Sequence, residues 1–314
     1  MGMRLVRPAL VFAAAISISA FAQDPKRDPD QIGSRDVAKG LNWYSIEKEE
    51  ALGKAMADQV MRSARMVTDP VVSEYVNRIG QNLARNSDSK FPLTIHVIED
   101  ESINAMSLPG GFFFVNTGLI LEAATEAELA GGMAHEIAHI AARHTTRKAT
   151  RQQIAQMATV PLIFMGGWAG YGTRQGGGVL TPLALLQFDR PFETEADMLG
   201  LQYLYKSGYD PNGMVDILEK IYALNASQPG RVSQIFQTHP ATGERIVAAQ
   251  KDIQELLQSR PQYVVTTSEF NEVQARLRTI LAPRKRDAPS LYPPTLRRAD
   301  PKLAKLSAAG SRPS

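Results

Sequence analysis

The stretch "GGMAHEIAHIAARH", residues 131–144, holds two histidines four residues apart, with a glutamate directly after the first. The chain has five histidines, and three of them fall here among mostly small or apolar residues. On an α-helix, residues four apart differ by only about 40° around the axis. His135 and His139 would therefore project from one face of a helix, where they could bind the same metal ion.

Glu136 completes the pattern His-Glu-x-x-His, in which the glutamate acts as base for a water molecule beside a zinc ion. The alternative is a pair of surface histidines on an alanine-rich helix. The alanines favour the metal site, because small side chains let other elements approach closely. We expect one helix from Glu126 to about Met157. On such a helix His144 lies about 180° from His135, so we expect it to support the site from outside or to contact the helix end.

A catalytic zinc site keeps three protein ligands and one open position, so a third ligand is needed. The stretch "FETEADMLG", residues 192–200, offers Glu193 and Asp197 four residues apart on one face of the next helix. One of them can bind zinc while the other accepts the free ring N–H of a ligand histidine. The alternative is that acidic residues gather in the first turn because of the helix dipole. Glu195 lies about 200° around the helix from Glu193, and we expect it to point elsewhere.

The rest of the sequence predicts a mostly α-helical α+β domain over residues 45–281. Apolar residues alternate in "FPLTIHVIED", residues 91–100, and are dense in "GGFFFVNTG", residues 110–118. Both stretches predict strands of a small sheet beside the metal-binding helix. The remaining helices are expected at residues 45–65, 69–87, 193–207, 212–225, 241–258 and 268–281.

Residues 1–22 have the features of a secretory signal peptide, with two arginines, an apolar stretch and a small-residue cleavage site at Ala20-Phe21-Ala22. The alternative, an uncleaved anchor, is disfavoured because the apolar stretch is shorter than the roughly 20 residues of a spanning helix. We therefore expect export to the periplasm, with residues 23–44 as an extended leader. The chain has no cysteine, so its stability must come from the core and any bound metal rather than from disulfides.

Positive charge is concentrated at the two ends of the chain, while residues 23–281 carry 25 basic and 30 acidic residues. The domain lacks a basic stripe, and we expect no nucleic-acid partner. The basic, proline-rich residues 282–314 are expected to be a disordered tail, either solubilising or in weak contact with anionic lipid or a partner. Residues 160–187 are too interrupted by glycines for a membrane span and are expected to form a mobile flap.

Four blocks, "NAMSLPGGFFFVNTGLI", "HEIAHIAARH", "ETEAD" and "QTHPATGER", resemble the gluzincin family of zinc metallopeptidases that includes the CAAX prenyl proteases, HtpX and BepA. The resemblance covers about residues 45–257 and implies a zincin-like fold. It also implies that Glu193 is the third zinc ligand beside His135 and His139, and that Asp197 supports a ligand histidine.

The same resemblance implies that the strand near Gly110–Val115 is an edge strand on which a peptide substrate can lie. It implies that His239 and Arg245 lie near the metal. The sequence lacks the spanning helices of the HtpX and prenyl-protease branches, and it lacks the helical repeat domain that follows the protease in BepA. We therefore expect neither membrane-embedded substrates nor partners that bind such repeats.

We expect an exported zinc endopeptidase with one Zn²⁺ per chain, acting on polypeptides such as misfolded envelope proteins. Glu136 would take a proton from the attacking water and deliver it to the leaving amine. Three roles stay open for His239: a reversible cap on the open zinc position, a hydrogen-bond donor to the oxyanion, or a residue that only packs. The alternative function is a non-catalytic, zinc-pinned module that binds chains like a chaperone. Glu136 argues against it, because a structural site needs no base.

Overall fold

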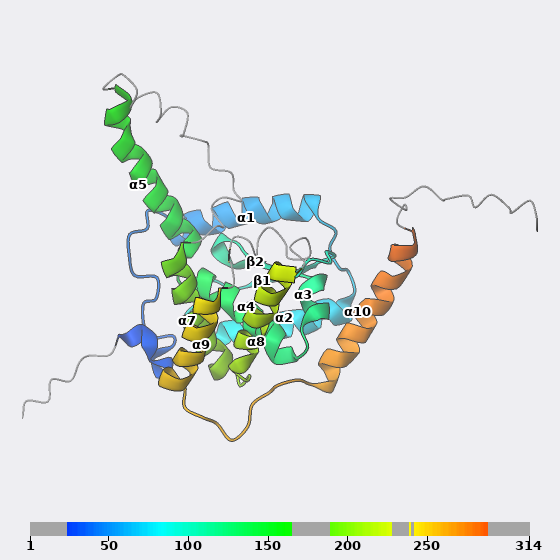
Figure 1. Ribbon diagram of the computed structural model, residues 1–314. Helices are drawn as coiled ribbons and strands as arrows, with labels where there is room; N and C mark the ends of the chain where they lie inside the picture. Colours follow the sequence, from blue (N-terminus) through cyan, green and yellow to red (C-terminus); the bar gives the residue numbers. More distant parts are fainter. Residues whose placement is uncertain (1–23, 165–188, 228–238, 240–241, 288–314) are drawn as a thin grey trace, which may run out of the picture.

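The structure of the protein, a computed structural model, describes residues 24–164, 189–227, 239 and 242–287 (Figure 1). The predicted signal peptide lies outside the described residues, as do most of the predicted flap and most of the predicted tail. No helix in the described ranges is both long enough and apolar enough to cross a membrane.

The described chain is mostly α-helical with one small sheet, which confirms the predicted α+β class. The 3₁₀ turns are η1 (Pro25–Arg27), η2 (Pro29–Gln31) and η3 (Pro109–Gly111), and the strands are β1 (Thr94–Ile98), β2 (Ala105–Ser107) and β3 (Phe112–Asn116). The helices are α1 (Ile46–Ser63), α2 (Pro70–Arg85), α3 (Thr117–Glu122), α4 (Glu126–Ala141), α5 (His144–Phe164), α7 (Arg190–Lys206), α8 (Asn212–Ser227), α9 (Gly243–Leu256) and α10 (Ser268–Asp287).

The sheet has the strand order β1-β3-β2, with β1 parallel and β2 antiparallel to β3. The prediction of an edge strand near Gly110–Val115 is therefore wrong, because Gly110 and Gly111 belong to η3 and β3 has a neighbouring strand on both sides. The edge strand of that block is β2, which the sequence did not predict because three residues are too few to show an alternating pattern.

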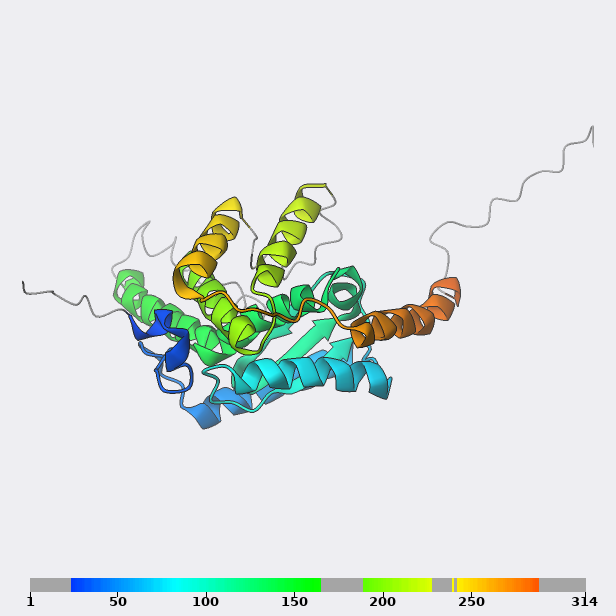
Figure 2. The same ribbon diagram turned by 90° about the horizontal axis from the view of Figure 1, so that it is seen from below.

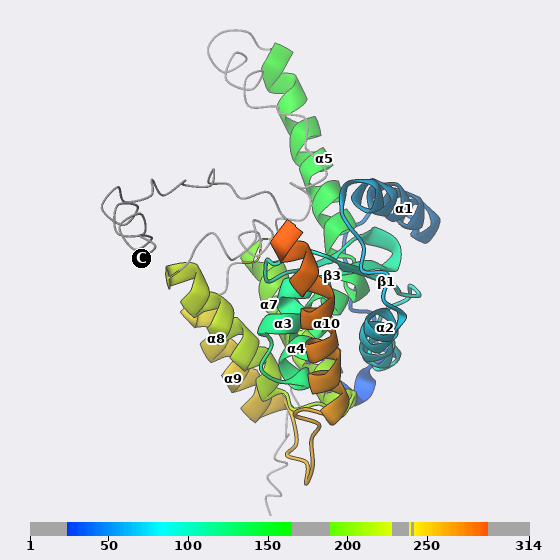
Figure 3. The same ribbon diagram turned by 90° about the vertical axis from the view of Figure 1, so that its right-hand side faces the viewer.

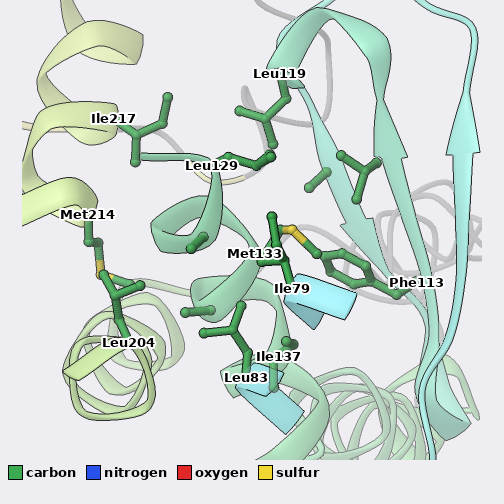
Figure 4. Close-up of a cluster of buried hydrophobic side chains, with 14 of the residues drawn as sticks. Ile79, Leu83, Phe113, Leu119, Leu129, Met133, Ile137, Leu204, Met214 and Ile217 are labelled. Atoms are coloured by element: carbon green, nitrogen blue, oxygen red, sulfur yellow. The ribbon is translucent and has the colours of Figure 1, made fainter. Parts of the chain in front are cut away.

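Helix α4 is the centre of the molecule and contacts α2, α7, α8 and strand β2. Helices α8 and α9 lie on one side of it and α1 and α2 on the other, as the two turned views show (Figures 2 and 3). In the core, Met133 of α4 lies close to Phe113 of β3 and Ile79 of α2 (Figure 4). Burying a side chain of this size contributes about 1.5–3 kcal/mol. The opposite face of the sheet buries Phe114 against Met56 of α1.

The single helix predicted from Glu126 to Met157 is wrong, because the chain forms two helices, α4 and α5, that meet at Arg143. Arg143 has a φ of 55°, in the left-handed region that disfavours residues other than glycine. Its Nε donates to Glu49 of α1 at 2.7 Å and its Nη2 donates to the carbonyl of Tyr44 at 2.7 Å. Since these contacts come from distant segments and no glycine or proline marks the break, the sequence gives no local signal for it.

The leader, residues 23–44, is not wholly extended, because it contains η1 and η2. Its charged side chains pair with helix α7. Lys26 Nζ lies 2.5 Å from Glu195 Oε1, and Asp30 accepts from Lys206 Nζ at 2.6 Å. At the other end of the chain, α10 continues to Asp287, past the predicted boundary at residue 281. The leader is therefore part of the folded body.

Candidate metal centre

Four buried side chains form a group that could hold a metal ion: His135 and His139 from α4, Glu193 from α7, and His239 from the segment before α9. One ligand atom from each lies within 4.8 Å of all the others. The Nε2 atoms of the two α4 histidines are 3.1 Å apart. Glu193 Oε2 lies 3.5 Å from His135 Nε2, and Glu193 Oε1 lies 3.5 Å from His139 Nε2.

These three separations fit a tetrahedral zinc ion. With zinc–nitrogen and zinc–oxygen bonds of about 2.0–2.1 Å, neighbouring ligand atoms lie about 3.3–3.4 Å apart. Burial lowers the pKa of His139 well below its ordinary value, which favours the neutral ring that binds a metal, whereas at His135 the carboxylates of Asp197 and Glu193 outweigh burial and raise the pKa to about 10. The donor set and the spacing therefore suit zinc bound by His135, His139 and Glu193.

Small residues let the helices that carry the ligands approach one another. A Cβ atom added at Gly200 of α7 would lie 3.1 Å from the Cα of His135, and one added at Gly131 would lie 2.8 Å from the backbone of Met214 in α8. Both distances are shorter than ordinary carbon contacts of about 3.5–4.0 Å. Glycine at position 200 therefore lets α7 bring Glu193 to the histidines of α4, and glycine at position 131 lets α8 pack closely against α4.

Asp197 orients His135 from the side away from the metal ligands. Its Oδ1 lies 2.9 Å from His135 Nδ1, and Arg245 holds the carboxylate with two bonds of 2.7 Å. Burial raises the pKa of Asp197, but Arg245 and His135 outweigh it, so the net pKa is lowered and the group stays ionised. This is the arrangement by which a carboxylate fixes the ring of a zinc-ligating histidine.

Arg245 is brought close to the metal ligands. Its Nη1 lies 3.0 Å from Glu193 Oε2 and donates to the backbone carbonyl of His239 at 3.1 Å. Together with the two bonds to Asp197, these contacts let Arg245 position both carboxylates, and its predicted catalytic role stays a prediction.

His139 is oriented by a second histidine, which the break at Arg143 places beside it. His144 Nδ1 lies 2.8 Å from His139 Nδ1, and His144 Nε2 lies 3.0 Å from Glu195 Oε2. Burial lowers the pKa of His144 to about 4, so the ring is neutral near pH 7. The prediction that His144 supports the site from outside fits this geometry. Glu195 points away from the metal ligands, as expected, and faces His144 instead.

Glu136 lies on the side of the site where α4 meets the sheet. Its Oε2 accepts hydrogen bonds from Ser107 Oγ at 2.7 Å and from Ser107 N–H at 3.2 Å. Both residues are buried. Sequence analysis missed Ser107, because nothing in the spacing of "NAMSLPGG" links that serine to a glutamate 29 residues later.

His239 joins the ligand group through Glu193. Its Nδ1 lies 2.7 Å from Glu193 Oε1, and its ring centroid lies 5.0 Å from that of His139 and 5.7 Å from that of His135. The ring is buried, at 4% exposure. The structure therefore brings His239 into the site, next to the predicted third ligand.

Comparison with known proteins gives the family. The family model described as Peptidase family M48 matches residues 70–253. The chain is 30% identical over 271 residues to the beta-barrel assembly-enhancing protease of Escherichia coli K12, covering 84% of this chain and 55% of that protein. It is 33% identical over 225 residues to the mitochondrial metalloendopeptidase OMA1 of Schizosaccharomyces pombe, covering 66% and 64%. It is 27% identical over 213 residues to the metalloprotease LoiP of Escherichia coli K12, covering 66% and 82%.

The chain belongs to peptidase family M48. The predicted resemblance to the zinc metallopeptidases around HtpX and BepA is thereby confirmed, and so is the prediction of a metallopeptidase at the level of the family. The chain spans about half the length of the beta-barrel assembly-enhancing proteases it matches.

Proposed function

We propose that the protein is an exported zinc endopeptidase of the periplasm that hydrolyses polypeptides in envelope protein quality control. The observation that carries the proposal is the convergence of His135, His139 and Glu193 at spacings that suit zinc, with Glu136 on the same helix. Export rests on the predicted signal peptide, and the role in the envelope rests on similarity to the beta-barrel assembly-enhancing proteases.

The chemistry follows from the charges of the site. A zinc ion held by the three ligands would make a water molecule more acidic and polarise the peptide carbonyl. Glu136 takes the proton of the attacking water and transfers it to the amine that leaves. Ser107, which donates two hydrogen bonds to one oxygen of Glu136, fixes the direction of that carboxylate. Asp197 and Arg245 hold His135 in place throughout the reaction.

The substrate would add to the sheet at β2. Asn116 N–H donates to the Asn104 carbonyl, and Leu108 N–H donates to the Phe112 carbonyl. Between these two bonds, successive residues of β2 direct their backbone groups alternately towards β3 and away from it. In an antiparallel pair this alternation turns the backbone groups of Ala105 and Ser107 away from β3. Ser107 directs its N–H to Glu136. A peptide paired with the outer edge of β2 would therefore run past the catalytic base.

We propose that His239 holds the protease in a latent form. Its ring belongs to the group of four potential ligands, and it would occupy the position that water or the substrate carbonyl must take. The bond between its Nδ1 and Glu193 keeps the ring there. Activation then requires that His239 moves away from the metal position. Arg245 of α9 donates to the backbone carbonyl of His239, so this movement would also change the contacts of Arg245.

The non-catalytic alternative, a zinc-pinned binding module, is tested together with the proposal. Envelope fractions from cells with the wild-type protein and with Glu136→Gln would be compared by quantitative proteomics. We expect substrates to accumulate, or to be trapped on the variant, while the cells with wild-type protein clear them. Identical envelope proteomes, or the protein remaining in the cytoplasmic fraction, would contradict the proposed function.

A further inference from the structure

The two histidines of the metal site are supported in different ways. His135 is held directly by a carboxylate, because its Nδ1 lies 2.9 Å from Asp197. His139 reaches a carboxylate only through another ring: its Nδ1 lies 2.8 Å from His144, whose Nε2 lies 3.0 Å from Glu195. The support of His139 therefore has one more residue than that of His135. It also continues through Glu195 to Lys26, which precedes the residues 70–253 that match the family model.

We propose that His144, Glu195 and Lys26 form a positioning relay that holds the metal ligand His139, so that the leader completes the support of the zinc site. The relay rests on the metal site of the proposed function, but not on peptide hydrolysis. It is defined by three contacts: His139 to His144, His144 to Glu195, and Glu195 to Lys26.

The position of the protons follows from the chemistry of the ligand. A histidine that binds metal through Nε2 carries its proton on Nδ1 and needs an acceptor there. The nitrogen facing it is Nδ1 of His144, which can accept only if the proton of His144 is on Nε2. That Nε2 faces Glu195 Oε2 at 3.0 Å. The contact with His144 thus fixes the tautomer of His139, and the contact with Glu195 fixes the tautomer of His144.

The carboxylate at the end of the relay is held by two cations. Arg147 Nη1 lies 3.2 Å from Glu195 Oε2, the oxygen that faces His144, and Lys26 Nζ lies 2.5 Å from the other oxygen, Oε1. Lys26 is fixed in turn by donating to the carbonyl of Val37 at 3.0 Å. Side-chain exposure falls from 21% at Lys26 to 17% at Glu195 and 0% at His144, so the relay runs from the surface into the interior.

The geometry of His144 also depends on the segments that precede the family match. The backbone turn at Arg143 brings the ring of His144 back to α4, and Arg143 is anchored by Glu49 and Tyr44. These two residues and Lys26 all precede residue 70, where the match to the family begins. Helix α7 therefore supplies a carboxylate for each ligand histidine, Asp197 for His135 and Glu195 for His139, and the N-terminal segment holds the parts of the second arrangement in place.

The test measures zinc affinity in four variants of the full chain, by competition with a chelating indicator. His144→Leu keeps a buried side chain against Phe192 but removes both hydrogen bonds, and Glu195→Gln removes the charge at a partly exposed position. We expect each to weaken zinc binding by about 10- to 100-fold. Lys26→Met should weaken it by about two- to fivefold, the effect of losing a partly exposed ion pair.

The matched control is Lys206→Met, which removes a second described ion pair between the leader and α7, with Asp30, and does not touch the relay. It should bind zinc like the wild type. In the cobalt-substituted protein, His144→Leu should alter the visible absorption bands because His139 tilts, and Lys206→Met should not. Wild-type zinc affinity in folded Glu195→Gln would overturn the relay, and equal affinities of Lys26→Met and Lys206→Met would overturn the part played by the leader. A wild-type protein that binds no zinc would instead refute the proposed function.

Discussion

His239 and His139 share one oxygen of Glu193: Oε1 lies 2.7 Å from His239 Nδ1 and 3.5 Å from His139 Nε2. His239 is therefore a fourth potential ligand of the metal ion, beside His135, His139 and Glu193. Since hydrolysis needs an open position, we expect His239→Ala to raise the basal rate on an unfolded protein substrate, measured by fluorescence release with zinc content held equal. A lower rate would make His239 an oxyanion donor instead, and an unchanged rate in the folded, zinc-loaded variant would remove it from the active site.

The second prediction concerns the third ligand. Zinc should be present at one ion per chain in the purified protein and should be lost with chelator. Because Glu193 and the two histidines come from different helices, zinc should also raise the melting temperature. Glu193→Ala should lose the metal and this increase, as measured by elemental analysis and thermal unfolding. Full zinc occupancy in the variant would refute the assignment of Glu193.

The third prediction tests the support of His135. Asp197→Ala removes the partner of His135 Nδ1 and of Arg245, so zinc affinity should fall by about 10- to 100-fold. Thr194→Ala is the control on the same helix, because Thr194 is exposed and its Oγ1 donates only to the Arg190 carbonyl among the contacts described. Equal zinc affinities of the two variants would contradict the role of Asp197.

The fourth prediction is a pH dependence in metal-free protein. The pKa of His144 is lowered by burial from 6.5 to about 4, so the unfolded chain binds a proton between these values that the folded chain does not. Stability from this group is therefore full above pH 6.5 and is lost as the pH falls towards 4, by roughly 3 kcal/mol at most.

Urea unfolding in the presence of chelator, at pH 7 and pH 4.5, measures this dependence. His144→Leu cannot take up the proton, so it should lose less stability than the wild type between the two values. An equal or larger loss in His144→Leu would contradict the prediction.

Helical spacing explains which parts of the site could be predicted from sequence. His135 and His139 share a face of α4, and Glu193 and Asp197 share a face of α7, because residues four apart on a helix lie side by side. The boundaries of α7, α8 and α9 are within a few residues of the predicted ones for the same reason.

The contacts that could not be predicted from the sequence depend on packing between segments far apart in the chain. The position of His144 follows from a left-handed residue, Arg143, which is held by Glu49, and no local pattern marks such a residue. Strand β2 was missed because it is three residues long, and with it went Ser107, which binds Glu136. Lys26 lies 169 residues from its partner Glu195, so only the fold could join them.

The most direct test of peptide hydrolysis by this site is the rate and zinc content of Glu136→Gln. Glutamine keeps the size and the hydrogen bonds of the side chain to Ser107 but cannot take the proton of water. We predict that Glu136→Gln retains one zinc per chain while hydrolysis of an unfolded substrate falls by at least about 100-fold. Unchanged hydrolysis, or loss of zinc together with activity, would contradict the role of Glu136 as the catalytic base.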